Sequence, residues 1–313
     1  MRPRRVYHPP MLLRASEMSM EAALRDLRSD DPRVRAAAAD ALGDLGEEAT
    51  PEVTAALVPV LGDARWEVRC QAALSLAALG HAIASDHAAL PALLARLDDD
   101  HADVRQAAAI ALGRMGHMAA WDRLLAGLKE GPPDVRFQAA MSLAELDPPG
   151  AYEPLVAALN DKDAEVRAHV ASALAVVGDR RAAGWLATAL EDPDARVRAE
   201  AACALAILGD RRATEHLVPL LGQADEQFRV LDLLEDLGDP AAAPAVARLL
   251  RRFLAPQAIK VRAAAALLAV APEHADAPRA KELLQRALKS GRPDVRGLAE
   301  EAAQRLGTAL PRS

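Results

Sequence analysis

Residues 163–182 read DAEVRAHVASALAVVGDRRA, and residues 194–213 repeat the pattern as DARVRAEAACALAILGDRRA. Both stretches contain a Val-Arg pair, a run rich in alanine and leucine, and the ending Gly-Asp-Arg-Arg-Ala. In the first stretch, apolar residues recur at helical spacing from Val166 to Val177, and Gly178 is a typical helix stop. The pattern therefore predicts an amphipathic helix that ends just before this glycine.

The Val-Arg pair recurs along most of the chain. It begins at residues 34, 68, 104, 135, 166, 197, 261 and 295, and Phe228-Arg229 keeps the same register. The steps lie between 31 and 36 residues, with a mean of about 33, which is typical of helix-pair repeats. A shorter apolar segment, such as the one carrying Leu155, Val156 and Leu159, precedes the pair. We therefore predict an all-α fold, a right-handed α-solenoid of about nine two-helix repeats.

Local signals place the expected helix ends. Asp31-Pro32 and Asp192-Pro193 have the form of an N-cap residue followed by proline in the first turn. Glycines follow the second helices of other repeats, where they act as stops. These glycines are Gly46, Gly80, Gly116, Gly209, Gly238 and Gly307.

Composition limits the functions that we consider. Hydrophobic residues make up 51% of the 313 residues but aromatic residues only 3%, so the core must consist mainly of Ala, Leu and Val. The formal net charge of −7 argues against nucleic-acid and anionic-membrane partners. Two cysteines cannot build a disulfide framework, and we expect a cytoplasmic protein. We divide it into a leader at 1–18, a single repeat array at 19–307 and a tail at 308–313.

The unit D-x-x-V-R-x-x-A-A-x-A-L-x-x-L-G-D-x-R-A resembles the HEAT-like repeats of the phycobilisome-lyase type over about residues 19–307. The resemblance implies the solenoid and leaves function open. A phycobilin lyase that handles a tetrapyrrole is one alternative. Another is an oxidoreductase similar to deoxyhypusine hydroxylase, which holds iron with repeated His-Glu pairs, and no His-Glu dipeptide occurs here. We expect no metal site and no cofactor, and we favour a non-enzyme over an enzyme.

The resembling repeats use Asp and Arg side chains as a ladder between neighbouring units. Here an aspartate lies four residues before several of the recurring arginines. The pairs are Asp163 with Arg167, Asp194 with Arg198, and Asp225 with Arg229. We interpret them as ion pairs that set the stacking register, with ligand binding as the alternative. Repeats seven and eight depart from the pattern, because Ala271-Pro272 replaces the Leu-Gly ending, and we expect a bend near 225–275.

One face of the second helices carries the candidate binding site. With the valine as position 0, positions 2, 6 and 10 lie roughly opposite the core-facing positions 0, 4, 7, 8 and 11. Several of these outward positions are apolar, as expected of a partner-binding groove; the alternative is that neighbouring helices or the leader cover them. Together with nearby polar positions they are Cys70, Leu74, Gln106, Ile110, Arg114, Phe137, Met141, Glu145, His169, Val176 and Ile207.

We therefore predict a non-enzymatic scaffold or adaptor that binds a protein segment, such as a peptide helix, along the concave side of the solenoid. In this hypothesis Leu74, Ile110, Phe137 and Met141 are the apolar anchors. Arg114, Glu145 and His169 supply polar contacts. Neither a membrane nor a nucleic acid is expected as a partner, and the oligomeric state stays open.

Overall fold

The structure is a computed structural model that describes residues 19–80, 87–116, 118–146 and 148–307. Every regular element among these residues is helical. The chain divides into two compact units, residues 1–158 and 159–313, which we call unit 1 and unit 2. The expected leader and tail lie outside the described residues, and a single array over 19–307 stays a prediction.

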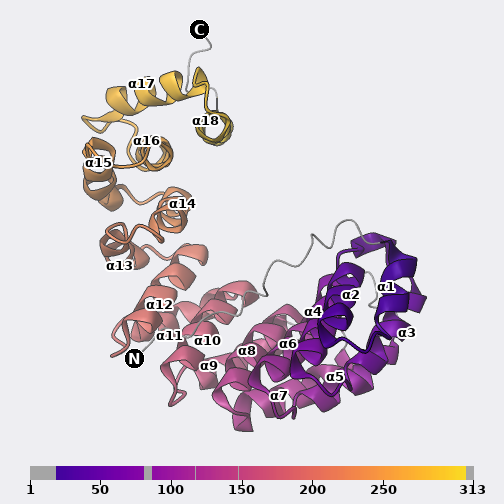
Figure 1. Cartoon of the computed structure of the whole chain (residues 1–313). Helices are drawn as coiled ribbons and strands as arrows, with labels where there is room; N and C mark the ends of the chain where they lie inside the picture. Colours follow the sequence, from indigo (N-terminus) through magenta and orange to yellow (C-terminus); the bar gives the residue numbers. More distant parts are fainter. Residues whose placement is uncertain (1–18, 81–86, 117, 147, 308–313) are drawn as a thin grey trace. The chain divides into compact units, whose positions relative to one another are not determined.

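Unit 1 contains the helices labelled α1 to α9 (Figure 1). They are α1 (Met20–Asp26), α2 (Pro32–Gly43), α3 (Pro51–Val60), α4 (Trp66–Leu79), α5 (Leu90–Arg96), α6 (Ala102–Arg114), α7 (Trp121–Glu130), α8 (Pro133–Leu146) and α9 (Pro148–Ala158). The second helices α2, α4, α6 and α8 pack on one another in chain order, and α1, α3, α5 and α7 each pack on the helix that follows. Unit 1 is thus a stack of helix pairs in two layers.

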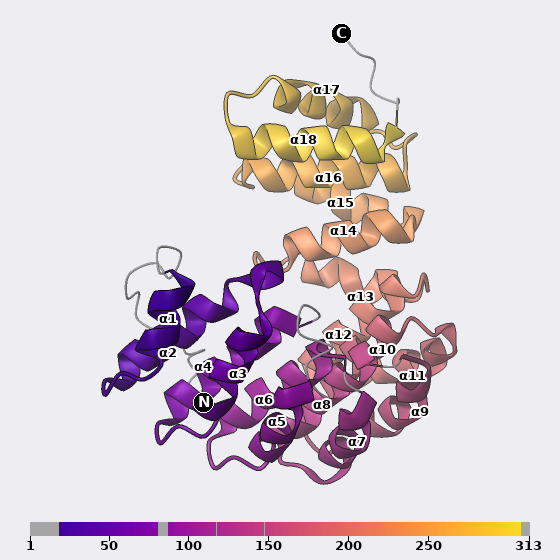
Figure 2. The same ribbon diagram turned by 90° about the vertical axis from the view of Figure 1, so that its right-hand side faces the viewer.

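Unit 2 continues the same alternation (Figure 2). Its helices are α10 (Ala164–Val177), α11 (Ala183–Ala189), α12 (Ala195–Ile207), α13 (Ala213–Leu220), α14 (Gln227–Leu237), α15 (Ala243–Arg251), α16 (Gln257–Val270), α17 (Ala277–Leu288) and α18 (Pro293–Arg305). The second helices are α10, α12, α14, α16 and α18, and α16 and α18 lie side by side in Figure 2. The prediction of an all-α solenoid built from two-helix repeats is confirmed.

The recurring valine is buried in most of the second helices. Val68, Val104 and Val166 are fully buried, and so are the alanines four and five residues after most of these valines. Because alanine has a single methyl group, neighbouring helices approach closely along these positions. Apolar burial between neighbouring repeats therefore contributes to the stability of the stack.

Two glycines in unit 1 permit still closer approach of second helices. A Cβ atom on Gly43 of α2 would lie 2.9 Å from the Cα and Cβ atoms of Ser75 of α4. A Cβ atom on Gly113 of α6 would lie 2.8 Å from the Cβ atom of Ser142 of α8, whose hydroxyl donates to the Ala109 carbonyl at 2.8 Å. Any side chain larger than hydrogen would push these helix pairs apart.

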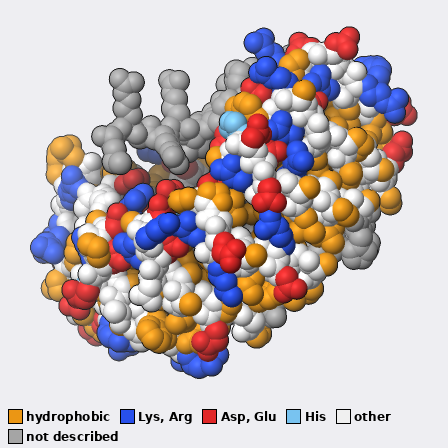
Figure 3. All heavy atoms as spheres, turned by 90° about the horizontal axis from the view of Figure 1, so that it is seen from below, with side chains coloured by type: hydrophobic (Ala, Val, Ile, Leu, Met, Phe, Trp, Pro, Cys, Tyr) orange, Lys and Arg blue, Asp and Glu red, His pale blue; other side chains and the backbone are white. Residues whose placement is uncertain are grey.

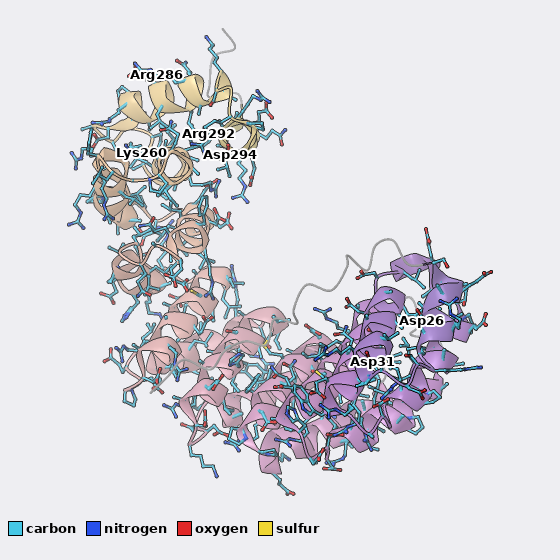
Figure 4. The ribbon with its side chains drawn as sticks, viewed as in Figure 1. Asp26, Asp31, Lys260, Arg286, Arg292 and Asp294 are labelled. Carbon is cyan, nitrogen blue, oxygen red and sulfur yellow. The ribbon has the colours of Figure 1, made fainter. Side chains whose placement is uncertain are left out.

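The helix stops agree with the sequence. All seven glycines that were expected to end second helices have positive φ, from +36° at Gly80 to +77° at Gly209. At the other end, the Asp31 side chain accepts from the Arg33 amide and caps α2, with Pro32 at the first helical position (Figure 4).

The expected cap at Asp192 is wrong. Asp194, two residues later, caps α12 by accepting from the Arg196 amide at 2.8 Å. The Asp192 carboxylate is engaged elsewhere, by an arginine of the preceding repeat.

Candidate partner-binding face

The arginine that follows the recurring valine, here called the ladder arginine, has one geometry in several repeats. Its Nη1 atom donates to backbone carbonyls five and six residues earlier, as Arg35 does to Ser29 and Asp30 at 2.8 and 3.1 Å. Its Nε and Nη2 atoms, which we call the fork, bind both oxygens of Asp63 in the next repeat at 2.6 and 2.9 Å. The interpretation of these arginines as structural ladder residues is therefore confirmed for this repeat.

Three more repeats show the forward pairing. The fork of Arg69 binds both oxygens of Asp99 at 2.9 and 2.6 Å, and both side chains are at least nine-tenths buried. Arg105 binds Asp134 at 2.8 to 3.0 Å. In unit 2, Arg167 holds both oxygens of Asp192 at 2.7 and 2.9 Å.

Our prediction of which aspartates pair with the ladder arginines was wrong. We expected Asp163 and Asp194 to join the ladder, but both side chains instead cap the helices that follow them. The acceptor in most forward pairs lies five residues before the valine of the next repeat, as Asp63, Asp99 and Asp192 do.

Further along unit 2 the ladder reverses direction. Arg229 of α14 binds both oxygens of Glu200 in the preceding second helix at 2.9 and 2.6 Å. Arg262 of α16, which is 2% exposed, likewise reaches back to Asp232 and Glu235 of α14. The reversal occurs in the repeats whose sequence departs from the pattern.

Arg198 lies between the forward and the reversed pairs. Its Nη1 atom donates to the carbonyls of Asp192 and Pro193 at 2.6 and 3.0 Å, as in the other ladder arginines. No carboxylate among the described residues binds its fork. The residue at the acceptor position of the next repeat is Gln223.

In unit 1 the predicted groove residues belong to α4, α6 and α8. Leu74 is 38% exposed. Arg114 and Glu145 are exposed, and the other predicted residues are half-buried. Those half-buried residues are Cys70, Gln106, Ile110, Phe137 and Met141. Burial raises the pKa of the Cys70 thiol to about 12, which disfavours the nucleophilic thiolate form.

In unit 2 the predicted groove residues lie on α10 and α12. Val176 and Ile207 are 49% and 58% exposed, at position 10 of successive second helices. His169 is half-buried and its Nδ1 atom lies 2.8 Å from the Glu165 carbonyl. Two further outward positions, Ala168 and Cys203, are buried, so the outward face is not uniformly open.

A pocket of about 700 Å³ opens on unit 2 between α10, α12 and α13. Its lining from α10 and α12 includes Ala168, His169 and Ser172 together with Ala199 and Glu200. These are positions 2, 3 and 6 of their helices. At 100° per residue, positions 2, 3, 6 and 10 fall within one side of a helix, so the pocket shares the face that carries the exposed Val176 and Ile207. We call this surface the second-helix face of unit 2.

The charged groups around the pocket are largely paired. Burial raises the pKa of the Glu200 carboxyl, but the hydrogen bonds and charge of Arg229 outweigh it, so this pKa lies below its usual value. The Ser172 hydroxyl also donates to Glu200 at 2.9 Å. Glu226 lies 3.7 Å from the same arginine. Arg198 thus stands out as a lining cation held by carbonyl groups alone.

Sequence reasoning missed several exposed apolar side chains. Phe253 and Leu254, in the connection between α15 and α16, are 90% and 83% exposed, and Trp185 of α11 is 51% exposed. The Phe-Leu pair between two expected helices was a signal in the sequence that could have predicted exposed apolar side chains. On the face drawn in Figure 3, Lys and Arg side chains are interspersed with Asp and Glu rather than gathered into one basic tract.

Within the described ranges, no three His, Cys, Asp or Glu side chains group in a way that could hold a metal ion. His101 instead stacks on Trp66, with ring centroids 3.7 Å apart. None of the helices in the described part of the chain is sufficiently long and apolar to cross a membrane.

A family model described as HEAT repeats matches residues 20–113, 90–165 and 152–230. No curated protein is similar enough in sequence to match.

Three solved structures are among those similar to this chain. Kap121p bound to Ste12p is 14% identical with a TM-score of 0.63, covering 92% of this chain and 40% of that chain. The Escherichia coli protein YibA is 17% identical with a TM-score of 0.53, covering 83% of this chain and 99% of that one. The CpcE–CpcF complex of phycocyanin lyase from Nostoc is 24% identical, with a TM-score of 0.45 and coverage of 91% and 98%. At these identities the likeness concerns the fold alone.

Proposed function

The chain belongs to the HEAT-repeat family, and from that premise we propose that it is a non-enzymatic scaffold that binds a segment of a protein partner along its second-helix face. One observation carries the proposal. In unit 2 the pocket of about 700 Å³ lies on the same helix face as two exposed aliphatic side chains, Val176 and Ile207. A concave, partly apolar surface with a few polar groups is typical of a recognition site.

The two aliphatic side chains supply apolar contact area. They occupy the same position of neighbouring repeats, α10 and α12, so a partner segment crossing both helices would cover both at once. Covering an exposed Val or Ile side chain fully contributes about 1.5–3 kcal/mol. The pocket beside them offers His169 and Ser172 as polar contacts. The stacked helices are preformed, so little ordering cost falls on the scaffold.

In unit 1 the proposal assigns the same role to α4, α6 and α8. Leu74, Ile110, Phe137 and Met141 would make apolar contacts, and these side chains are half-buried or exposed. Cys70, Gln106, Arg114 and Glu145 border them on the same helices. Half-buried apolar side chains suit partner contact because they are already ordered by their neighbours and lose little rotamer freedom on binding.

The test compares two faces of unit 2. A partner is first identified by capture with the wild-type protein, and its affinity is then measured for Val176→Glu/Ile207→Glu and for Trp185→Glu. Trp185 is as exposed as the two aliphatic residues but belongs to the first helix α11, so it is a matched control.

We expect the double variant to bind at least tenfold more weakly, because charged groups replace two apolar contacts, while Trp185→Glu binds as the wild type does. Circular dichroism must show unchanged helix content in both variants. Equal affinities for the double variant and the wild type would contradict the proposal.

A further inference from the structure

The inference concerns Arg198, and it rests on the proposed function because it names the chemistry of the partner segment. We propose that the unit 2 pocket binds a carboxylate group of the protein partner, an Asp or Glu side chain or a chain terminus, on the fork of Arg198. The partner carboxylate would take the place that an aspartate of the next repeat occupies beside the other forward-pairing arginines.

The ladder arginines whose forks bind an aspartate show the geometry that we propose for the partner carboxylate on Arg198. Arg35, Arg69 and Arg167 each bind both oxygens of a ladder aspartate, from Nε to one oxygen and from Nη2 to the other, at 2.6 to 2.9 Å. The Nη2 atom of Arg69 also binds Asp100. Such bidentate, charge-assisted pairs are among the stronger and more directional polar contacts in proteins. The repeat thus builds the same carboxylate site several times.

Arg198 is held in the same way without its carboxylate. Its Nη1 atom donates to two carbonyls, five and six residues earlier, as the Nη1 atom of Arg35 does. These bonds orient the planar guanidinium, and the fork is therefore preorganised. Preorganisation lowers the entropy cost of binding a ligand.

The sequence explains why the carboxylate is missing. Asp63 lies five residues before Val68 and ends the stretch Leu61-Gly62-Asp63. Gln223 lies five residues before Phe228 and ends the equivalent stretch, Leu221-Gly222-Gln223. In the second copy a neutral amide therefore stands where the first has an aspartate. An amide offers one acceptor oxygen and no charge, and it makes no hydrogen bond with Arg198 in the structure.

The vacant fork borders the pocket. Both Arg198 and Gln223 line it, so a group from outside the chain can reach the place between them. Two of the lining glutamates, Glu200 and Glu226, are engaged by Arg229. Glu165 and Glu215 also line the pocket, and their charge disfavours a polyanion. The site therefore fits one carboxylate better than a phosphate group or a nucleic acid.

A small probe tests the site without the partner. The peptide acetyl-Ala-Glu-Ala-amide is titrated into the full-length protein while the Nε–Hε NMR signals of the arginines are recorded, with Arg198 assigned by Arg198→Lys. We expect a saturable shift of the Arg198 signal and none at Arg167, whose fork is already filled. The matched peptide acetyl-Ala-Gln-Ala-amide is expected to leave both signals in place. An Arg198 signal that ignores the Glu peptide, or moves equally with the Gln peptide, overturns the proposal.

A second variant fills the site from within. Gln223→Asp restores the ladder aspartate, so the Arg198 signal should no longer respond to the Glu peptide, and the thermal midpoint should rise by about 2 °C. Gln223→Asn is the control and should neither block the response nor raise the midpoint. Persistence of the peptide-induced shift in Gln223→Asp would also overturn the proposal.

The partner itself separates this inference from the proposed function. We expect Arg198→Gln to bind the partner about tenfold more weakly, consistent with the loss of a charge-assisted hydrogen bond. If Arg198→Gln binds normally while Val176→Glu/Ile207→Glu does not, the carboxylate inference fails and the proposed function stands. If the Glu peptide moves the Arg198 signal but no partner depends on the second-helix face, the site stands and the proposed function fails.

Discussion

The two units use one structural arginine in two ways. In unit 1, Arg35, Arg69 and Arg105 each pair forward with an aspartate of the next repeat. In unit 2 the forward pairing ends after Arg167, and Arg229 pairs backward with a glutamate. The comparison shows that Arg35 and Arg198 keep the same hydrogen bonds to backbone carbonyls although only Arg35 has a carboxylate partner. The fork of a ladder arginine can therefore become available to another ligand.

One loop position differs between the repeats that pair with Asp63, Asp99 or Asp192 and the later repeats. Five residues before the recurring apolar residue, the repeats that receive a bidentate forward pair have Asp63, Asp99 or Asp192. At the same position later repeats have Gln223 and Pro256. Neither residue has a carboxylate that could bind the guanidinium of an arginine. Arg229, facing the repeat with the proline, turns back to the preceding helix.

The largest expected difference between the units concerns the ladder arginines themselves. Arg69→Ala should lower the free energy of local unfolding by about 3 kcal/mol, because it leaves Asp99 buried without its main partner. Arg198→Ala should cost about 1 kcal/mol or less, because only bonds to carbonyls are lost. Native-state hydrogen exchange in α6 and α12 measures the two values. Equal losses of free energy in the two variants would contradict the distinction between a fork that binds an aspartate and one that does not.

Helix spacing provides a second comparison. Gly113→Ala in unit 1 should destabilise the fold by about 1–3 kcal/mol, because the new Cβ atom would lie 2.8 Å from the Cβ atom of Ser142. Gly184→Ala in α11 of unit 2 should stabilise it by roughly 0.5–1 kcal/mol, because no atom lies within 4 Å of the new Cβ. Urea unfolding of both variants gives the signs. A stable Gly113→Ala variant would show that the second helices of unit 1 can separate without cost.

Acid should act oppositely on two carboxyl groups. The hydrogen bond from Arg35 holds the pKa of Asp63 in unit 1 below its usual 3.8, so its stabilising effect is complete above pH 3.8 and is lost as pH falls through the lowered pKa. Burial raises the pKa of Glu235 in unit 2 above 4.5, so its contribution is complete below pH 4.5 and is lost as pH rises through the raised pKa.

Hydrogen exchange in α2 and α14, corrected for intrinsic rates, follows the two groups between pH 3 and pH 7. Asp63→Asn should remove the loss of protection in α2 as pH falls, whereas Asp40 of α2, whose pKa burial raises, acts in the opposite direction. Glu235→Gln should remove the loss of protection in α14 as pH rises. A change of the same sign in both helices would contradict the assignment of opposite pKa directions.

Features that depend on one repeat were predictable from the sequence. The glycine stops follow from the need for positive φ at the end of a helix, and Gly178 and Gly209 both have it. The burial of Val166 and Leu174 follows from helical periodicity. The Asp31-Pro32 start was correct because the cap uses only neighbouring residues.

Features that depend on the next repeat were not predictable in the same way. Asp192-Pro193 has the same local form as a helix start, yet its carboxylate belongs to the Arg167 ladder pair. Which outward positions stay open also depends on neighbouring helices, and so Ile207 is 58% exposed whereas Cys203, four residues earlier, is 1% exposed. The lack of an acidic partner for Arg198 can be predicted from the sequence once the correct acceptor position is known, because Gln223 replaces an aspartate there.

The most direct test of the account is site-specific photo-crosslinking inside cells that make the protein. A photoreactive phenylalanine is placed at Val176 or Ile207 on the second-helix face, and at Trp185 on the first helix as the control. The account predicts a crosslink to the same protein from positions 176 and 207 and none from position 185. Crosslinks from position 185 alone, or from none of the three while the variants fold normally, would contradict partner binding on the second-helix face.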